Sequence, residues 1–210
     1  MKKVILLGLF VVLLCFNLTQ AKPCDKRFSL SASFLQTVPT KESLRAATGG
    51  GKTGYDVRFD ICLKKGNLRP SLGLAVSASP LEGRKLIFDR EYSSGTQDTY
   101  HTSNWKIWTV GAYTRLLLEN DLFSPFLEVG VGLYHLNLDY SVPWETKSIS
   151  SNSFGYNVGF GLAVSTGQFP ISLFGKINYH QILIKTPINL LPKVSSIGYV
   201  SYGAGLKVTF

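Results

Sequence analysis

His101 and Ser103, in the run His101-Thr102-Ser103-Asn104, have the residue types and the spacing of a nucleophilic site. A histidine can act as the general base that activates a serine hydroxyl, and a carboxylate usually orients that histidine. Three histidines lie among many serines in this chain, so a His-x-Ser spacing also arises by chance. We therefore expect structural loop residues here, with a nucleophilic site as the alternative.

Two other motifs point less clearly to chemistry. Residues 46–53, AATGGGKT, end like a phosphate-binding loop, but Ala46 stands where the first glycine is required, and the segment leads into a strand rather than a helix. His135 and His180 lie on different predicted strands without a second ligand at metal spacing, which indicates hydrogen-bonded side chains. The sequence therefore predicts no nucleotide, cofactor or metal site.

Alternation of polar and apolar residues along the predicted strands places a third group of side chains, which are ionisable, on one face. Residues 53–63 place Asp56, Arg58 and Asp60 on one face and large apolar residues on the other. The same polar face of other predicted strands carries further ionisable residues, namely Arg115, Glu128, Lys176, His180 and Lys207. Because buried charges are costly unless paired, we expect a structural network of interior ion pairs. A hairpin closed at 119–124 would pair Arg115 with Glu128, and a proton or ion path is the alternative use of these residues.

Eight segments of the sequence have this alternation and would form the strands that carry the polar and the apolar faces. They are 27–38, 53–63, 68–79, 104–118, 125–140, 153–165, 171–184 and 196–210. The connections alternate between short turns, at 64–67, 119–124 and 166–170, and long loops, at 39–52, 80–103, 141–152 and 185–195. A barrel with short turns on one side of a membrane and long loops on the other has this rhythm, whereas a soluble sandwich has no reason for it. The predicted fold is all-β, an eight-stranded antiparallel up-and-down transmembrane β-barrel.

The strands carry two further signals. Seven aromatic residues near strand ends predict an interfacial girdle: Trp105, Trp108, Tyr113, Phe126, Tyr134, Tyr179 and Tyr202. Beyond His135 the apolar parity shifts to Leu136, Leu138 and Tyr140, which predicts a β-bulge or a strand top above the membrane. Because side chains fill the interior of an eight-stranded barrel, we expect a packed polar core in which inward glycines leave room for larger residues.

The motifs FLEVGVGLY, FGYNVGFGLAV and YGAGLKVTF resemble those of the OmpA/OmpX-like outer-membrane β-barrel family, and the resemblance covers the whole of residues 22–210. It implies an outer-membrane location and a terminal strand that the barrel-assembly machinery reads as an insertion signal. The residues of that signal are Tyr202, Leu206, Val208 and the terminal Phe210. The family hosts adhesins, structural proteins and lipid-modifying enzymes, so the resemblance is strong for architecture and weak for function.

His101 and Ser103 also resemble the His-x-Ser-Asn stretch of the outer-membrane lipid A deacylases, which are eight-stranded barrels. That resemblance implies His101 as general base and Ser103 as nucleophile. This sequence has no glutamate at the spacing found in those enzymes. Lipid A deacylation is therefore the alternative to a non-enzymatic role.

Residues 1–21 have the features of a cleaved signal peptide: two lysines, an apolar run from Val4 to Leu14, and small residues before a cut after Ala21. Because this leader holds two lysines and no acidic residue, its removal lowers the formal net charge from +9 to +7. The basic residues are scattered without aromatic stacking partners, which argues against nucleic acid as a partner. Contact with lipopolysaccharide phosphates is the simpler explanation.

The predicted mature domain, residues 22–210, keeps two cysteines. Cys24 precedes the first predicted strand and Cys62 ends the second, so both lie at the periplasmic mouth of the predicted barrel. An even pair of cysteines in an exported protein predicts a disulfide. Two free thiols are the alternative.

These features predict a Gram-negative outer-membrane barrel with a structural or adhesin-like role carried by long extracellular loops. Its expected partners are outer-membrane lipid, lipopolysaccharide, the barrel-assembly machinery, and an extracellular ligand or host surface. A lipid A-modifying enzyme is the alternative function, and a narrow channel is the third.

Overall fold

The computed structural model describes residues 28–40, 48–63, 67–83, 85–92, 95–118, 122–142, 145–165, 170–184 and 196–210. The strands in these ranges are β1 (Phe28–Pro39), β2 (Thr48–Gly51), β3 (Thr53–Cys62), β4 (Leu68–Gly83), β5 (Lys85–Tyr92), β6 (Gly95–Leu118), β7 (Phe123–Val142), β8 (Glu145–Ser165), β9 (Ile171–Leu183) and β10 (Ser196–Thr209). No helix among the described residues is long and apolar enough to cross a membrane.

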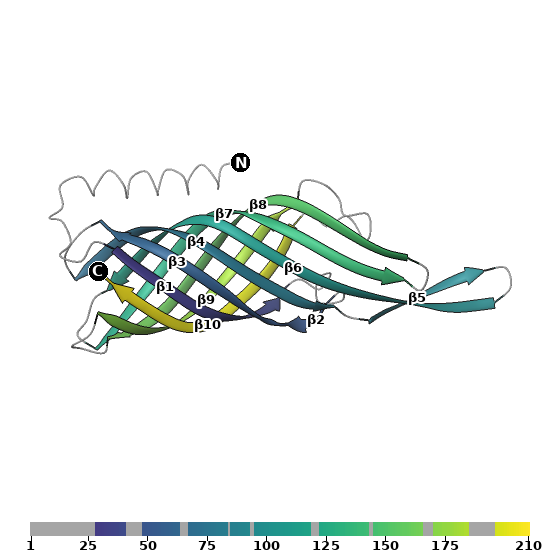
Figure 1. Cartoon of the computed structure of the whole chain (residues 1–210), viewed down its shortest axis with the longest axis horizontal. Coiled ribbons are helices and arrows are strands. Elements are labelled where there is room, and N and C mark those ends of the chain that lie inside the picture. Colours follow the sequence, from purple (N-terminus) through teal and green to yellow (C-terminus); the bar gives the residue numbers. More distant parts are fainter. Residues whose placement is uncertain are drawn as a thin grey trace.

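Eight of these strands form a closed antiparallel barrel (Figure 1). Neighbours follow the chain from β1 through β3, β4, β6, β7, β8 and β9 to β10, and β10 pairs back with β1. At this seam the Phe210 amide donates to the Phe28 carbonyl oxygen at 2.8 Å. β2 and β5 are additional strands, paired with β4 and β6. The predicted eight-stranded up-and-down barrel is confirmed.

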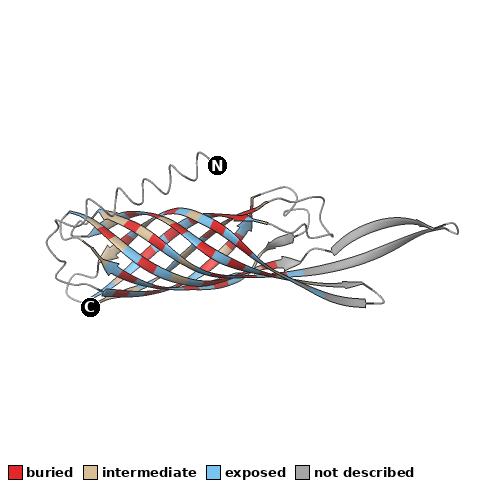
Figure 2. Ribbon diagram, turned by 90° about the horizontal axis from the view of Figure 1, so that it is seen from above, coloured by how far each residue is buried: buried red, intermediate tan, exposed pale blue. Residues whose placement is uncertain are grey.

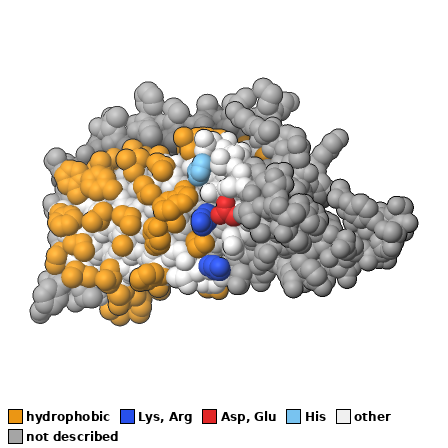
Figure 3. All heavy atoms as spheres, turned by 45° about the vertical axis from the view of Figure 1, so that its right-hand side comes forward, with side chains coloured by type: hydrophobic (Ala, Val, Ile, Leu, Met, Phe, Trp, Pro, Cys, Tyr) orange, Lys and Arg blue, Asp and Glu red, His pale blue; other side chains and the backbone are white. Residues whose placement is uncertain are grey.

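Alternating burial shows that the wall separates two environments (Figure 2). In β3, every second residue from Gly54 to Asp60 is buried, and the residues between them are exposed. Large apolar side chains occupy the exposed positions of the barrel, among them Phe34, Val57, Leu74, Val110, Leu133, Phe160 and Leu173. On the face seen in Figure 3 they form a broad orange band. Such a band is the membrane-facing surface of a transmembrane barrel, and we call it the membrane-facing band.

The predicted aromatic girdle is only partly correct. Trp108, Tyr179 and Tyr202 are exposed on the outer surface. The other four are buried in the lumen, none more than 3% exposed: Trp105, Tyr113, Phe126 and Tyr134. Successive side chains of a strand point to opposite faces, and these four share the parity of the inward-facing residues. Nearness to a strand end does not override that parity.

Three of the four predicted long loops contain strands. The segment 80–103, which we expected to be a long loop, holds the end of β4, all of β5 and the start of β6. In 141–152, β7 continues to Val142 and β8 begins at Glu145, and β2 lies within 39–52. These segments have no period-two alternation of apolar residues, so the sequence does not reveal their strands. The fourth loop, 185–195, lies outside the described residues.

No bulge interrupts β7 beyond His135. The register with β6 and with β8 continues without a shift up to Ser141. His135 stays on the outer face, and Leu136 is buried in the lumen. The predicted bulge is therefore wrong: the apolar parity shifts because the lumen itself becomes apolar at this height.

Candidate functional site

Six charged side chains in the lumen form one continuous chain of ion pairs. In order they are Lys176, Asp56, Arg58, Glu128, Arg115 and Asp60. They come from β3, β6, β7 and β9, and none is more than 5% exposed. Three acids face three bases, so the formal charges balance. Pairing of this kind is what makes the burial of charge tolerable.

Arg58 is the centre of this ion-pair chain. Its Nε lies 2.8 Å from Asp56 Oδ2, and its Nη1 lies 2.6 Å from both carboxylate oxygens of Glu128. Arg115 lies opposite Glu128 in the register of β6 and β7 and reaches Oε2 with its Nη2 at 3.2 Å. Its Nη1 lies 3.2 Å from Asp60 Oδ2. Glu128 therefore serves two arginines, one from the neighbouring strand and one from across the lumen.

Neutral hydroxyl groups complete the surroundings of the two aspartates. The Tyr113 and Ser29 hydroxyls both donate to Asp60, the serine at 3.2 Å. Asp56 accepts from Ser33 at 3.4 Å and also from the Lys176 ammonium. These donors occupy carboxylate lone pairs that the arginines do not reach, which lowers the cost of burying the charge.

Aromatic rings and glycines fill the space around the arginines. The ring of Tyr113 lies 4.8 Å from Arg58 Cζ, a distance at which a guanidinium is attracted to an aromatic face. A Cβ on Gly73 would lie 2.6 Å from Tyr113 Cζ, so only glycine leaves room for this ring. Gly161 does the same for Phe126. Inward glycines thus accommodate the larger lumen residues, in line with the expected packing.

An apolar cluster closes the lumen at the end opposite the C-terminus. It consists of Leu81, Trp105, Ile107, Tyr134, Leu136, Ile182, Ile197 and Tyr199. No member is more than 2% exposed, so these described side chains pack against one another away from solvent. Sequence reasoning predicts a polar core throughout and misses this cluster. The available signal was the parity shift at Leu136.

His180 lies between the ion-pair chain and the apolar cluster. Its Nδ1 is 3.1 Å from the Tyr134 hydroxyl, its Nε2 is 2.9 Å from Ser201 Oγ, and its ring stacks on Tyr199 with centroids 4.4 Å apart. His135 makes its hydrogen bond on the outer surface, to a residue of β8. No group of three or more potential metal ligands gathers among the described residues.

Two further predicted residues that the structure describes, Lys207 and Cys62, lie near the C-terminal end of the barrel. Lys207 is half-buried on the inner face, paired in register with Ser31 and Ser172, and its ion pairing stays a prediction. Cys62 is disulfide-bonded. Cys24 lies outside the described residues, as does the whole of the predicted signal peptide, so the Cys24–Cys62 pairing stays a prediction.

The predicted insertion signal lies on the membrane-facing side of β10 and at its end. Tyr202, Leu206 and Phe210 are exposed there, and Val208 is half-buried. β10 is paired along its length with β1 and with β9. It therefore closes the barrel, and its reading by the assembly machinery stays a prediction.

His101 and Ser103 lie on a strand rather than in a loop. The backbone register of β6 pairs His101 with Leu86 of β5 and Ser103 with Tyr140 of β7. Their side chains are outside what the structure describes, so the base and the nucleophile stay predictions. Residues 48–51 of the glycine-rich segment form β2, and the segment therefore does not open a helix.

Comparison with known proteins identifies this fold. No protein-family model matches the sequence, and no curated protein is significantly similar to it. Neisserial surface protein A aligns over 87% of this chain and 97% of its own, with a TM-score of 0.53 and 16% identity. Ail, the attachment invasion locus protein of Yersinia pestis, gives 0.51 and 14% over 89% of this chain and 100% of its own. The outer membrane protease OmpT from Escherichia coli gives 0.54 and 10% over 92% and 100%.

At these identities the similarity shows the fold alone. Together with the membrane-facing band, it confirms the resemblance to small outer-membrane barrels and the outer-membrane location. The matched proteins are a surface protein, an attachment protein and a protease, so the shared fold does not select a function.

Proposed function

We propose that this outer-membrane β-barrel is a non-enzymatic surface-binding protein whose recognition surface is a wall of strands above the membrane. The wall consists of β5 and the parts of β6, β7 and β8 that extend past the barrel opposite the C-terminus. Strand length carries the proposal: β6, β7 and β8 have 24, 20 and 21 residues, against 12 in β1 and 14 in β10. A tilted strand needs about 9–11 residues to cross a membrane, so the excess lies outside it.

The extra residues of these strands lie on one side of the barrel, at the end opposite the C-terminus. β6 and β7 stay paired up to Thr102 and Ser141, and β7 and β8 up to Val142 and Glu145. Beyond them β5 and the start of β6 form a two-stranded ribbon of eight paired positions, which adds roughly 25 Å at about 3.4 Å per residue. Figure 1 shows this ribbon projecting away from the end that carries the C-terminus.

The ribbon favours a protein ligand. β5 stands last in the strand order, so among the described strands it pairs on one side only. The free edge of a strand can pair with an extended segment of a partner. Charges in residues 85–104 nearly balance: Lys85 and Arg90 against Asp89, Glu91 and Asp98. A polyanionic ligand would call for a basic surface, so this composition supports recognition of polypeptide.

The packing of the lumen favours a function on the external surfaces of the barrel rather than conduction through it. An ion crossing it would have to displace the buried apolar cluster and separate the balanced pairs of the ion-pair chain. Side chains fill the interior of eight-stranded barrels in general. The function is therefore sought on the outer surfaces.

The membrane itself supplies the other proposed partners. The membrane-facing band contacts outer-membrane lipid. The positive charge of the predicted mature chain favours lipopolysaccharide phosphates next to the basic residues. During biogenesis, β10 and its terminal Phe210 would be read by the barrel-assembly machinery.

The test compares three forms of the full-length protein in the outer membrane of a bacterium that does not adhere, probed with immobilised fibronectin, laminin and collagen. In the first variant Asn-Gly replaces residues 86–101, so that the paired Lys85 and Thr102 are joined by a tight turn. The matched control, Ser93→Asn with Ser94→Gly, changes only the tip of the ribbon.

We expect the native protein and the tip control to bind at least one of these proteins, and the ribbon deletion to bind about tenfold more weakly. Heat-modifiable migration on a gel verifies that each barrel is folded. Equal binding by a folded ribbon deletion contradicts the proposal, as does a native protein that binds none of the three.

The enzymatic alternative has its own measurement. Ser103 is the nucleophile that the deacylase resemblance implies, so Ser103→Ala removes the reaction if it exists. We expect identical lipid A mass spectra from cells that express native protein and Ser103→Ala. A deacylated species that disappears with the substitution would establish an enzyme instead.

A further inference from the structure

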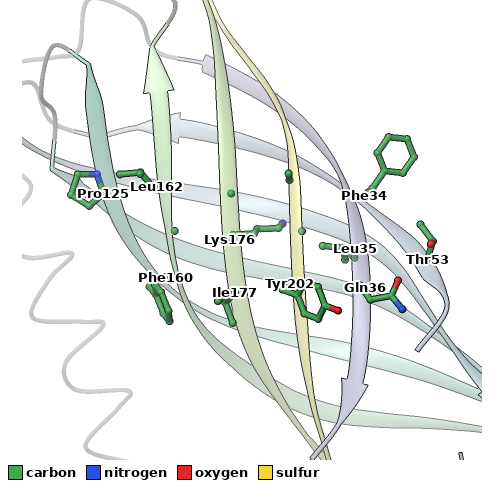
Figure 4. A pocket seen from close by; sticks show the side chains of 14 residues that line it. Phe34, Leu35, Gln36, Thr53, Pro125, Phe160, Leu162, Lys176, Ile177 and Tyr202 are labelled. Carbon is green, nitrogen blue, oxygen red and sulfur yellow. The ribbon is translucent and has the colours of Figure 1, made fainter. Parts of the chain in front are cut away.

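A groove of about 760 Å³ crosses the outer wall of the barrel over β8, β9, β10 and β1 (Figure 4). On its floor Gly175 and Ala204 lie side by side in register and face outward, so nothing larger than a methyl group covers the backbone there. Larger side chains border it: Phe34, Phe160, Leu162, Ile177 and Tyr202. Because the groove lies within the membrane-facing band, its occupant comes from the membrane.

Packing gives no reason for a glycine at position 175. A Cβ on the inward-facing Gly73 would collide with Tyr113, as described above. A Cβ on Gly175 would have the Gly203 carbonyl oxygen as its nearest neighbour at 3.9 Å, an ordinary van der Waals contact. Glycine weakens the interior of a strand. The effect of Gly175 is therefore to keep the groove open.

The floor of the groove, Gly175 and Ala204, is the middle of one row of the β-register, and the larger Leu162 and Phe34 stand on either side of it in that row. The row joins Pro125, Leu162, Gly175, Ala204 and Phe34 across adjacent strands. Pro125 is the third residue of β7 and Phe34 the seventh of β1, so the row climbs away from the C-terminal end. The row continues to Tyr55 of β3, so it crosses five strand spacings of about 4.8 Å and spans about 24 Å. With strands tilted by about 35–45° the row climbs about 15 Å, which is half of a hydrocarbon core of about 30 Å.

The two ends of the groove differ in polarity. The upper end, on β1 and β3, is lined by Gln36 and Thr53, and the Tyr202 side chain lies beside them. The lower end is lined by Pro125 and Leu162, which are apolar. Figure 4 shows Pro125 and Thr53 at opposite ends of the site. An apolar groove with polar groups at one end matches an amphiphile whose head lies at the membrane surface.

We propose that this groove binds one acyl chain of an outer-leaflet lipid, with the polar head beside Gln36 and Thr53 and the chain end toward Pro125. A rise of about half the hydrocarbon core, the bare floor and the polar upper end all match that ligand. A second copy of the barrel matches less well, since a stable interface buries about 800 Å² per partner. Phe34, which is 74% exposed, would hold such a broad surface away from the floor. The site is separate from the wall of strands and does not rest on the proposed function.

The test uses full-length protein in vesicles of phosphatidylethanolamine and phosphatidylglycerol, with a trace of phospholipid whose palmitoyl chain ends in a diazirine. After photolysis, mass spectrometry locates the labelled peptides. The filled variant carries Gly175→Leu and Ala204→Leu. The matched control is Ala112→Leu, which makes the same Ala→Leu exchange as at position 204 but on the outward face of β6, on the opposite side of the barrel.

We expect the groove peptides of β8, β9 and β10 to carry about fivefold more label than those of β4 and β6, a modest binding preference. The filled variant should lose this excess, and Ala112→Leu should keep it. Uniform labelling of the native barrel, or unchanged labelling of a filled variant that is folded by heat-modifiable migration, overturns the proposal. A native dimer that the filled variant converts to monomer also overturns it, because the occupant is then a second copy.

Discussion

Neutralising Glu128 tests the ion-paired lumen most directly. The Glu128 carboxylate is 1% exposed and accepts from Arg58 Nη1 at 2.6 Å and from Arg115 Nη2 at 3.2 Å. Glu128→Gln keeps the volume of the side chain but leaves one excess positive charge among the buried groups. Each arginine then loses one of its two carboxylate partners.

The expected cost follows from what remains after the substitution. Removing one partner of a buried ion pair destabilises a protein by about 3–5 kcal/mol. Arg58 still contacts Asp56 and Arg115 still contacts Asp60, so we expect Glu128→Gln to lie at the lower end, at about 3 kcal/mol. Glu128→Ala also leaves a cavity and should lie near the upper end.

Double-mutant cycles separate the two arginines. The Arg58–Glu128 contact has two hydrogen bonds of 2.6 Å, whereas those of Arg115 to Glu128 measure 3.2 and 3.4 Å. We therefore expect a coupling energy of about 3 kcal/mol for Arg58 with Glu128 and about 1 kcal/mol for Arg115 with Glu128.

The assay is equilibrium unfolding in urea from lipid vesicles, followed by tryptophan fluorescence. The control is Lys106→Gln, which breaks the surface pair with Asp139 at 3.7 Å, where the lysine is 59% exposed. A surface pair contributes no more than about 1 kcal/mol. Additive losses for Arg58 and Glu128, or a loss from Glu128→Gln no larger than that of the control, would refute the reasoning.

Three further predictions concern the ends and the packing of the barrel. Deleting Phe210 should lower the amount of folded barrel in outer-membrane fractions while export continues; an unchanged folded yield would remove the case for an insertion signal. Alkylation of the unreduced mature protein should add nothing to Cys24 or Cys62, and two adducts in its mass spectrum would exclude the disulfide. Gly73→Val should lower the free energy of unfolding by roughly 1–3 kcal/mol through overpacking against Tyr113, and an unchanged urea midpoint would mean that the ring can move aside.

The barrel could be predicted because its wall separates two very different environments. Lipid outside and paired polar groups inside impose a period of two on every crossing strand, which is visible at Asp56, Arg58 and Asp60. A local hairpin register is enough to place Arg115 opposite Glu128. The shorter contact, from Arg58 across the lumen, depends on the curvature of the closed barrel, which a strand-by-strand pattern does not contain.

The position of the four lumen aromatics could be predicted from the sequence, although we expected them in the interfacial girdle. Trp105 and Tyr113 share the parity of Arg115, and Phe126 and Tyr134 share that of Glu128, so alternation alone places all four inside. The wall of strands is a different case. Residues 85–103 and 141–152 have no period-two alternation of apolar residues, so the pattern that predicts a membrane-crossing strand is missing there.

The closed lumen determines where this protein can meet other molecules. The apolar cluster seals one end, and at the other end Phe126, Ala163 and Phe174 pack into a second apolar cluster below the ion-pair chain. Our two proposals therefore concern external surfaces, which have features that the strand pairing alone does not require. The wall rises on β5 to β8, and the open groove at Gly175 faces lipid across β8 to β1. In these proposals one surface lies in water and the other in the membrane, and they share no strand pairing except through the barrel, so we expect substitutions in the two surfaces to act additively.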